Sequence, residues 1–86
     1  MTYLNIRKIE DMNNIMITHE TIDNWFKYHA PDDLQIVKYG VIRETAKSLA
    51  MVIIDNTPES ADQTAALRKL RECVMTANAS IACKGI

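Results

Sequence analysis

The stretch DNTP at residues 55–58 decides the fold, because it interrupts two long runs that both have helical character. Proline disfavours the α conformation in the residue before it, and the polar residues ahead of this proline are typical of a helix end. A connection this short makes the two flanking helices antiparallel neighbours. We therefore predict a helical hairpin around residues 55–58.

The run before this turn predicts a first long helix that begins near Pro31. Proline suits the first helical position, and the acidic side chains of Asp32 and Asp33 complement the positive end of the helix dipole. Apolar residues recur along one stripe of this helix, at Tyr39, Ile42, Ala46, Leu49 and Ile53. This stripe is expected to pack against the second long helix.

The run after the turn predicts a second long helix that begins at Thr57 or Ser60. Thr57 before a proline is a good cap, and Ser60 with Gln63 fits a capping box. A seam with alternating steps of three and four residues follows, at Leu67, Leu70, Val74, Ala77 and Ile81. Gly85 is expected to end the helix, and Lys84 suits its negative end.

A short helix is expected ahead of the hairpin, at about residues 20–27. Thr18 can cap it, and Ile22, Trp25 and Phe26 would form its apolar face. The fold class is therefore all-α, an antiparallel hairpin of two long helices preceded by a short helix. We assign residues 1–17 to an N-terminal arm or weak helix, and residues 18–86 to the helical hairpin domain.

Length and charge limit the function classes. The chain of 86 residues has room for one domain, and its net charge of −1 provides no basic surplus. A protein that coats DNA or RNA must neutralise many phosphates, so neither is an expected partner. Two or three cations in one place would still suffice for a small phosphate ligand.

We expect a cytoplasmic protein with no membrane segment. Residues 1–10 lack the apolar core of a signal peptide, and no apolar run is long enough to cross a bilayer. Cys73 and Cys83 lie in one predicted helix at a separation of about 15 Å. A disulfide requires Cα atoms within about 7 Å, so both thiols are expected to be free, as in a reducing compartment.

The hairpin carries more apolar surface than it can bury alone. Residues beside the packing stripes include Val41, Val52, Ile54, Ala66, Cys73, Ala79 and Ala82. An apolar surplus of this kind usually marks a subunit interface. We therefore expect a homo-oligomer.

Catalysis is not expected. The only histidines are His19 and His29, and the sequence contains no Cys-x-x-Cys, His-x-x-x-His or Gly-rich phosphate loop. Cys73 and Cys83 occupy helix-packing positions, which favours structural thiols over a nucleophile. We predict that the protein is not an enzyme, and that it has no catalytic residue, metal site or cofactor.

Three polar residues near the helix ends are candidates for ligand contact. Tyr28 could stack on a nucleobase at the corner before the first long helix. Corner packing with a hydrogen-bonded tip is the alternative for Tyr28 and for His29. Asn78 interrupts a small apolar run, where it would need either an interhelical hydrogen bond or a ligand, and the hydrogen bond is the favoured interpretation.

Cations on the long helices are candidates for a phosphate site. Arg43 and Lys47 lie four residues apart and so share one helix face, where arginine can grip two phosphate oxygens at once. The alternative is a solvated surface with weak ion pairs. A second basic stretch, Arg68, Lys69 and Arg71, is expected to be solvated, with one member as a candidate to line a ligand site.

At these residues the chain resembles a known family. The first half of the match consists of Phe26-x-Tyr28-His29-x-Pro31, Gln35, Tyr39, Ile42-Arg43 and Ala46-Lys47. The second half consists of Ala66-Leu67, Leu70-Arg71, Val74-Met75, Ala77-Asn78-Ala79 and Ile81-Ala82. Together, over about residues 26–84, they resemble the phage anti-CBASS cyclic-nucleotide sponges, whose helical hairpin domain is shared with a Thoeris anti-defence sponge.

The resemblance implies a phage protein that acts in the host bacterial cytoplasm during infection. Such proteins bind and sequester cyclic oligonucleotide second messengers without cleaving them, so that the effectors of CBASS immunity stay inactive. Family members form homohexamers that hold cyclic dinucleotides, such as cyclic GMP-AMP, between protomers, and some also hold cyclic trinucleotides in separate pockets. The implied partners are these nucleotides and further copies of the chain.

The resemblance also implies roles for individual residues. Tyr28 would stack on a purine base, while His29 and Pro31 would shape the same corner. Arg43 is the first choice for a phosphate contact and Lys47 the second. Asn78 belongs to the second half of the match, and Lys84 would supply the cation that some relatives carry as an arginine. The alternative function is a small oligomeric helical module that binds nucleic acid or a host protein.

Overall fold

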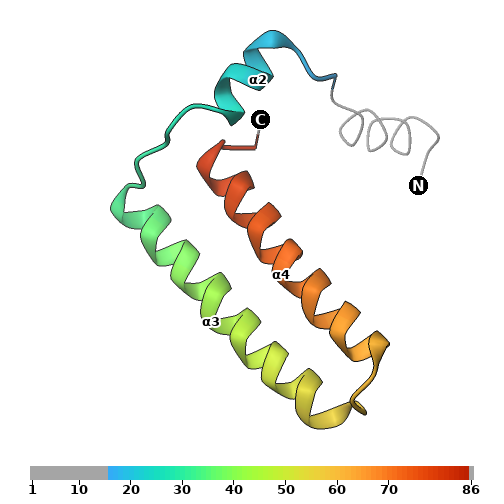
Figure 1. The fold of residues 1–86 in the computed structure, drawn as a ribbon. Helices are drawn as coiled ribbons and strands as arrows, with labels where there is room; N and C mark the ends of the chain where they lie inside the picture. The colour runs from blue at the N-terminus through green and yellow to red at the C-terminus, as the bar shows by residue number, and fades with distance from the viewer. Residues whose placement is uncertain (1–15, 86) are drawn as a thin grey trace, which may run out of the picture.

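Three helices make up the described part of the chain, residues 16–85, in the computed structural model (Figure 1). They are α2 at His19–Trp25, α3 at Asp33–Asn56 and α4 at Ala61–Ala82. No strand occurs within these residues, so the predicted all-α class is confirmed. Most of the predicted arm or weak helix at residues 1–17 lies outside the described residues.

The two long helices, α3 and α4, pack side by side and run in opposite directions (Figure 1). At one end, Gln35 Nε2 donates a 3.2 Å hydrogen bond to the carbonyl oxygen of Ile81. At the other end, Gln63 Nε2 donates to the carbonyl oxygens of Ile54, at 3.4 Å, and Thr57, at 3.1 Å. The start of each long helix is thus bonded to the end of the other.

The first long helix begins two residues later than predicted. Asp32 is its N-cap, and Asp32 Oδ1 accepts a 2.7 Å hydrogen bond from the backbone N–H of Gln35. In return, Gln35 Oε1 accepts a 3.1 Å bond from the backbone N–H of Asp32. Because this capping box requires an extended backbone at Asp32, Pro31 precedes the helix and does not occupy its first position.

Of the two predicted caps of the second long helix, the structure selects Ser60. Its Oγ accepts a 3.1 Å hydrogen bond from the backbone N–H of Gln63. Thr57 instead caps the end of α3, where its hydroxyl donates to the carbonyl oxygen of Ile53 at 2.7 Å. Only half of the predicted capping box forms, because the Gln63 side chain is bonded to the end of α3.

The C-terminal end of α4 is a Schellman motif. The N–H of Gly85 bonds to the carbonyl oxygen of Ser80 at 2.9 Å, and the N–H of Lys84 bonds to that of Ile81 at 3.3 Å. Both Lys84, with φ of 55°, and Gly85, with φ of 80°, are left-handed. The left-handed turn that ends the helix was predicted at Gly85 and begins one residue earlier, at Lys84. The left-handed conformation is energetically costly for a residue with a side chain.

The short helix α2 is capped as predicted. Thr18 Oγ1 accepts a hydrogen bond from the N–H of Thr21, and Thr21 Oγ1 accepts one from the N–H of Thr18, each at 3.2 Å. The helix ends at Trp25, two residues before the predicted end. Asn24 Nδ2 donates to the carbonyl oxygen of Cys83 at 3.3 Å, which links α2 to the end of α4.

The seam between α3 and α4 is only half-buried. All five predicted seam residues on α4 are half-buried, as are Tyr39, Ile42, Ala46 and Ile53 on α3. Leu49, predicted in the same stripe, is 48% exposed, because a single neighbouring helix covers only a narrow stripe. Among residues 16–85 no apolar side chain is buried, and Thr21 is the one buried residue.

No helix in residues 16–85 combines the length and the apolar character that crossing a bilayer requires.

Candidate ligand-binding site

A groove of about 280 Å³ with both cationic and apolar walls runs between α3 and α4. Its charged members are Arg43 and Lys47 from α3 and Arg71 from α4. Its apolar members are Ala46, Ala50, Leu67, Leu70, Val74 and Met75. We call this surface the cationic groove. Arg43 and Lys47, the two cations predicted to share one face of α3, therefore line the same site. Arg71 from α4 adds a third cation.

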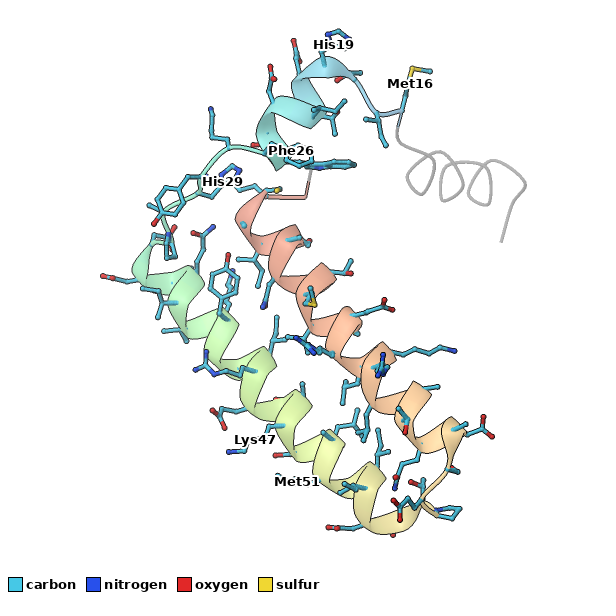
Figure 2. All side chains as sticks on the ribbon, viewed as in Figure 1. Met16, His19, Phe26, His29, Lys47 and Met51 are labelled. Atoms are coloured by element: carbon cyan, nitrogen blue, oxygen red, sulfur yellow. The ribbon has the colours of Figure 1, made fainter. Side chains whose placement is uncertain are left out.

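Helix register explains how these cations reach one groove. Residues 43 and 47 are one turn apart and so lie on the same side of the α3 seam. Lys47 is among the residues that line the groove, and in Figure 2 its side chain extends from α3 away from α4. All three cationic side chains are exposed. The groove therefore has an apolar floor and a positive rim.

The positive charge of this rim is largely uncompensated. The single ion pair among the described residues joins Arg43 Nε to Glu44 Oε1 at 3.7 Å, and both side chains are 69% exposed. An exposed pair of this kind contributes about 0–1 kcal/mol, so it competes weakly with an incoming anion. The Arg43 guanidinium also folds back over Gly40, where an added Cβ would lie 3.6 Å from Nη2.

The candidate residues at the α2–α3 corner do not line the cationic groove of the same chain. The side chain of Tyr28 is 84% exposed. His29 is half-buried, and its Nε2 lies 2.6 Å from the carbonyl oxygen of Asn24, within hydrogen-bonding distance. His29, labelled in Figure 2, thus has the hydrogen-bonded tip that the corner-packing alternative anticipates. Pro31 is exposed just before α3.

The remaining two candidates, Asn78 in the C-terminal half of α4 and Lys84 just after it, lie outside the cationic groove. Asn78 is half-buried, and its Oδ1 is shielded from solvent with no hydrogen-bond partner among the described residues. The favoured interhelical hydrogen bond is therefore not made by this oxygen. Lys84 is exposed in the Schellman motif. Neither residue lines the cationic groove.

A second groove, of about 370 Å³, lies on the other side of the same seam. It is lined by Val41, Ile42, Thr45, Ala46, Leu49, Leu70, Cys73, Val74 and Ala77. We call it the apolar groove. It shares Ala46, Leu70 and Val74 with the cationic groove. The two grooves therefore differ in charge, because cations line one of them and no charged residue lines the other.

Arg71 is the cation of the groove that was not singled out from the sequence. It belongs to the basic stretch that was expected to be solvated, with one unspecified member as a candidate to line a ligand site. One signal distinguishes it: Arg71 directly follows Leu70 and precedes Val74 by three positions, so it flanks the seam. Lys69 lies on the opposite side of the helix by the same periodicity, and it does not line the groove.

Comparison with known proteins gives one match. A family model described as Acb2/Tad1, hairpin domain, matches residues 18–82. This range contains α2, α3 and α4 and both grooves. No curated protein and no solved structure matches the chain.

Proposed function

The chain belongs to the Acb2/Tad1 hairpin-domain family of phage anti-CBASS and anti-Thoeris sponges, and we propose that it sequesters cyclic oligonucleotides without cleaving them. Cyclic dinucleotides such as cyclic GMP-AMP are the primary ligands in this proposal, with cyclic trinucleotides as a second class. The protein would act as a binding protein and not as an enzyme, in the cytoplasm of the infected bacterium.

The cationic groove is the observation that carries this proposal. Its rim provides three cations for phosphodiester groups, and its floor provides apolar surface for ribose and base. Arginine can bind two phosphate oxygens in parallel, which adds geometric selectivity to charge attraction. A sponge that competes with an immune effector needs tight binding, and a nanomolar Kd corresponds to about −12 kcal/mol.

Assembly of several copies is the second part of the proposal. A chain with no buried apolar side chain among its described residues must cover apolar surface elsewhere. We place the contact between copies at the apolar groove, and we expect a homohexamer as the resemblance implies. Assembly would also let Tyr28 of one copy approach the cationic groove of another, since its exposed ring does not line the groove of its own chain.

Isothermal titration of the full chain with cyclic GMP-AMP and with cyclic tri-adenylate tests the function. We expect heat of binding with a Kd in the nanomolar range for the dinucleotide. The bound nucleotide should be recovered intact after the protein is denatured, which distinguishes capture from hydrolysis. Absence of heat with both nucleotides, at tens of micromolar protein, would refute the proposal. Recovery of a linear nucleotide would refute its non-enzymatic part.

A further inference from the structure

We propose that Arg71 on α4 determines the selectivity of the cationic groove for ligands with two anionic groups. The inference rests on the proposed function, because it concerns how the same groove recognises its ligand. Arg43 and Lys47 hold one anionic group from the α3 wall, and Arg71 holds a second one from the α4 wall. The flat body of the ligand then lies over the apolar floor.

The position of Arg71 on its helix is the first support. It flanks Leu70 and Val74, which both form the floor, and Met75 continues the same rim one helical turn later. The α3 cations stand on the facing wall, because the two helices are antiparallel and in contact. A ligand with two anionic groups can therefore place one against Arg43 and Lys47 and the other against Arg71.

The distribution of charge is the second support. Arg43 shares its guanidinium with Glu44, whereas Arg71 takes part in no ion pair among residues 16–85. The α4 wall therefore presents an uncompensated fork of N–H donors. A cyclic dinucleotide carries two phosphodiesters joined by ribose rings and bases, which matches two cationic walls above an apolar floor. A cyclic mononucleotide offers a single phosphodiester to the same two walls.

Titration of matched full-length variants with cyclic GMP-AMP and with cyclic AMP tests the inference. Arg71→Gln removes the charge and keeps most of the stem, and Lys69→Gln removes the same charge from the opposite side of α4. We expect Arg71→Gln to weaken cyclic GMP-AMP binding about tenfold or more, since charge-assisted hydrogen bonds are the strong class. Lys69→Gln should change the affinity less than about twofold, as is usual for exposed charges away from a site.

The ratio of affinities for the two nucleotides is the decisive readout. Arg71→Gln should reduce the preference for cyclic GMP-AMP over cyclic AMP, because it removes the cation that we assign to the second phosphodiester, which cyclic AMP lacks. Equal effects of Arg71→Gln and Lys69→Gln, or an unchanged preference, would overturn the inference and leave the proposed function intact. Failure of the unmodified protein to bind cyclic GMP-AMP would overturn both.

A second variant keeps the test decisive if Arg71→Gln changes the assembly, which native mass spectrometry would report. Arg71→Lys retains the charge and the long stem but loses the planar fork of donors. It should preserve the native mass and still weaken cyclic GMP-AMP binding severalfold. Full affinity in Arg71→Lys, together with an altered mass in Arg71→Gln, would assign Arg71 to assembly and would overturn the inference.

Discussion

The side chain of Gln35 donates a 3.2 Å hydrogen bond to the carbonyl oxygen of Ile81, and so joins the first turn of α3 to the last turn of α4. The same side chain accepts the N–H of Asp32 in the capping box. One residue therefore caps a helix and closes the open end of the helix pair. Its two functions use different atoms, Oε1 for the cap and Nε2 for the contact with α4, and so can be separated by mutation.

Two substitutions of Gln35 should destabilise the fold by different amounts. Gln35→Ala removes both hydrogen bonds and is expected to cost about 1–2 kcal/mol of unfolding free energy. Gln35→Glu keeps an acceptor for the cap but has no N–H for Ile81, so its cost should be smaller. Urea unfolding at one fixed protein concentration measures both, since oligomers gain stability with concentration. Unchanged stability of Gln35→Glu relative to the unmodified protein would show that the link to Ile81 contributes nothing, and equal stability of the two variants would show the same of the cap.

Substitution of Lys84 should improve stability. Lys84 adopts a left-handed conformation with φ of 55°, which costs a residue with a side chain about 1–2 kcal/mol relative to glycine. Lys84→Gly is therefore expected to raise Tm by several degrees, while Lys84→Ala, which retains the strain, should not. A thermal melt compares them, and no gain for the glycine variant would contradict the prediction.

The same pair of variants tests the role in ligand binding that the resemblance implies for Lys84. Both variants remove the ammonium group, so both should weaken binding of cyclic tri-adenylate if Lys84 supplies a cation. Titration with cyclic tri-adenylate measures this effect separately from stability. Unchanged affinity in both variants would remove Lys84 from the site.

Removal of the Tyr28 ring should weaken ligand capture and leave assembly intact. The ring is 84% exposed, so it contributes little to the stability of its own chain. Loss of a base–aromatic stack costs about 1–3 kcal/mol, which corresponds to a loss of affinity of roughly 5- to 150-fold. Titration of Tyr28→Ala with cyclic GMP-AMP measures the loss, and Tyr28→Phe is the control that keeps the ring. Unchanged capture in Tyr28→Ala would remove Tyr28 from the site.

A carboxylate in the apolar groove should break the assembly. Leu49 lines this groove, whereas Met51 on the same helix does not line either groove, and both side chains are about half exposed. Leu49→Asp would bury an unpaired charge between copies, so we expect native mass spectrometry to show smaller species. Met51 is labelled in Figure 2. The Met51→Asp variant should retain the assembly.

Chemical labelling of Cys73 gives an independent measure of the same interface. This thiol is exposed in the single chain and lines the apolar groove. Alkylation of Cys73 should be slow in the assembled protein and faster in Leu49→Asp. Loss of assembly in both aspartate variants, or in Met51→Asp alone, would place the contact between copies on a different face.

Local signals predicted the helices well. The caps at Thr18 and Ser60, the break at residues 55–58 and the half-buried seam on α4 all follow from side chains within one or two turns of the feature they control. Errors occur where several neighbours compete. Pro31 and Asp32 both suit a helix start, and the reciprocal hydrogen bond with Gln35 selects Asp32. The exposure of Leu49 follows from the position of α4, which helical spacing within α3 does not specify.

The sequence by itself determined the all-helical class, the positions of the turns and the shared face of Arg43 and Lys47, because caps, breakers and helical spacing act over short stretches of chain. Only the tertiary structure decided that Arg71 joins them, that the seam separates a cationic groove from an apolar one, and that Tyr28 lies apart from both. These relationships depend on the rotation of each helix about its own axis against its neighbour. That rotation is set by the packing of side chains far apart in the sequence.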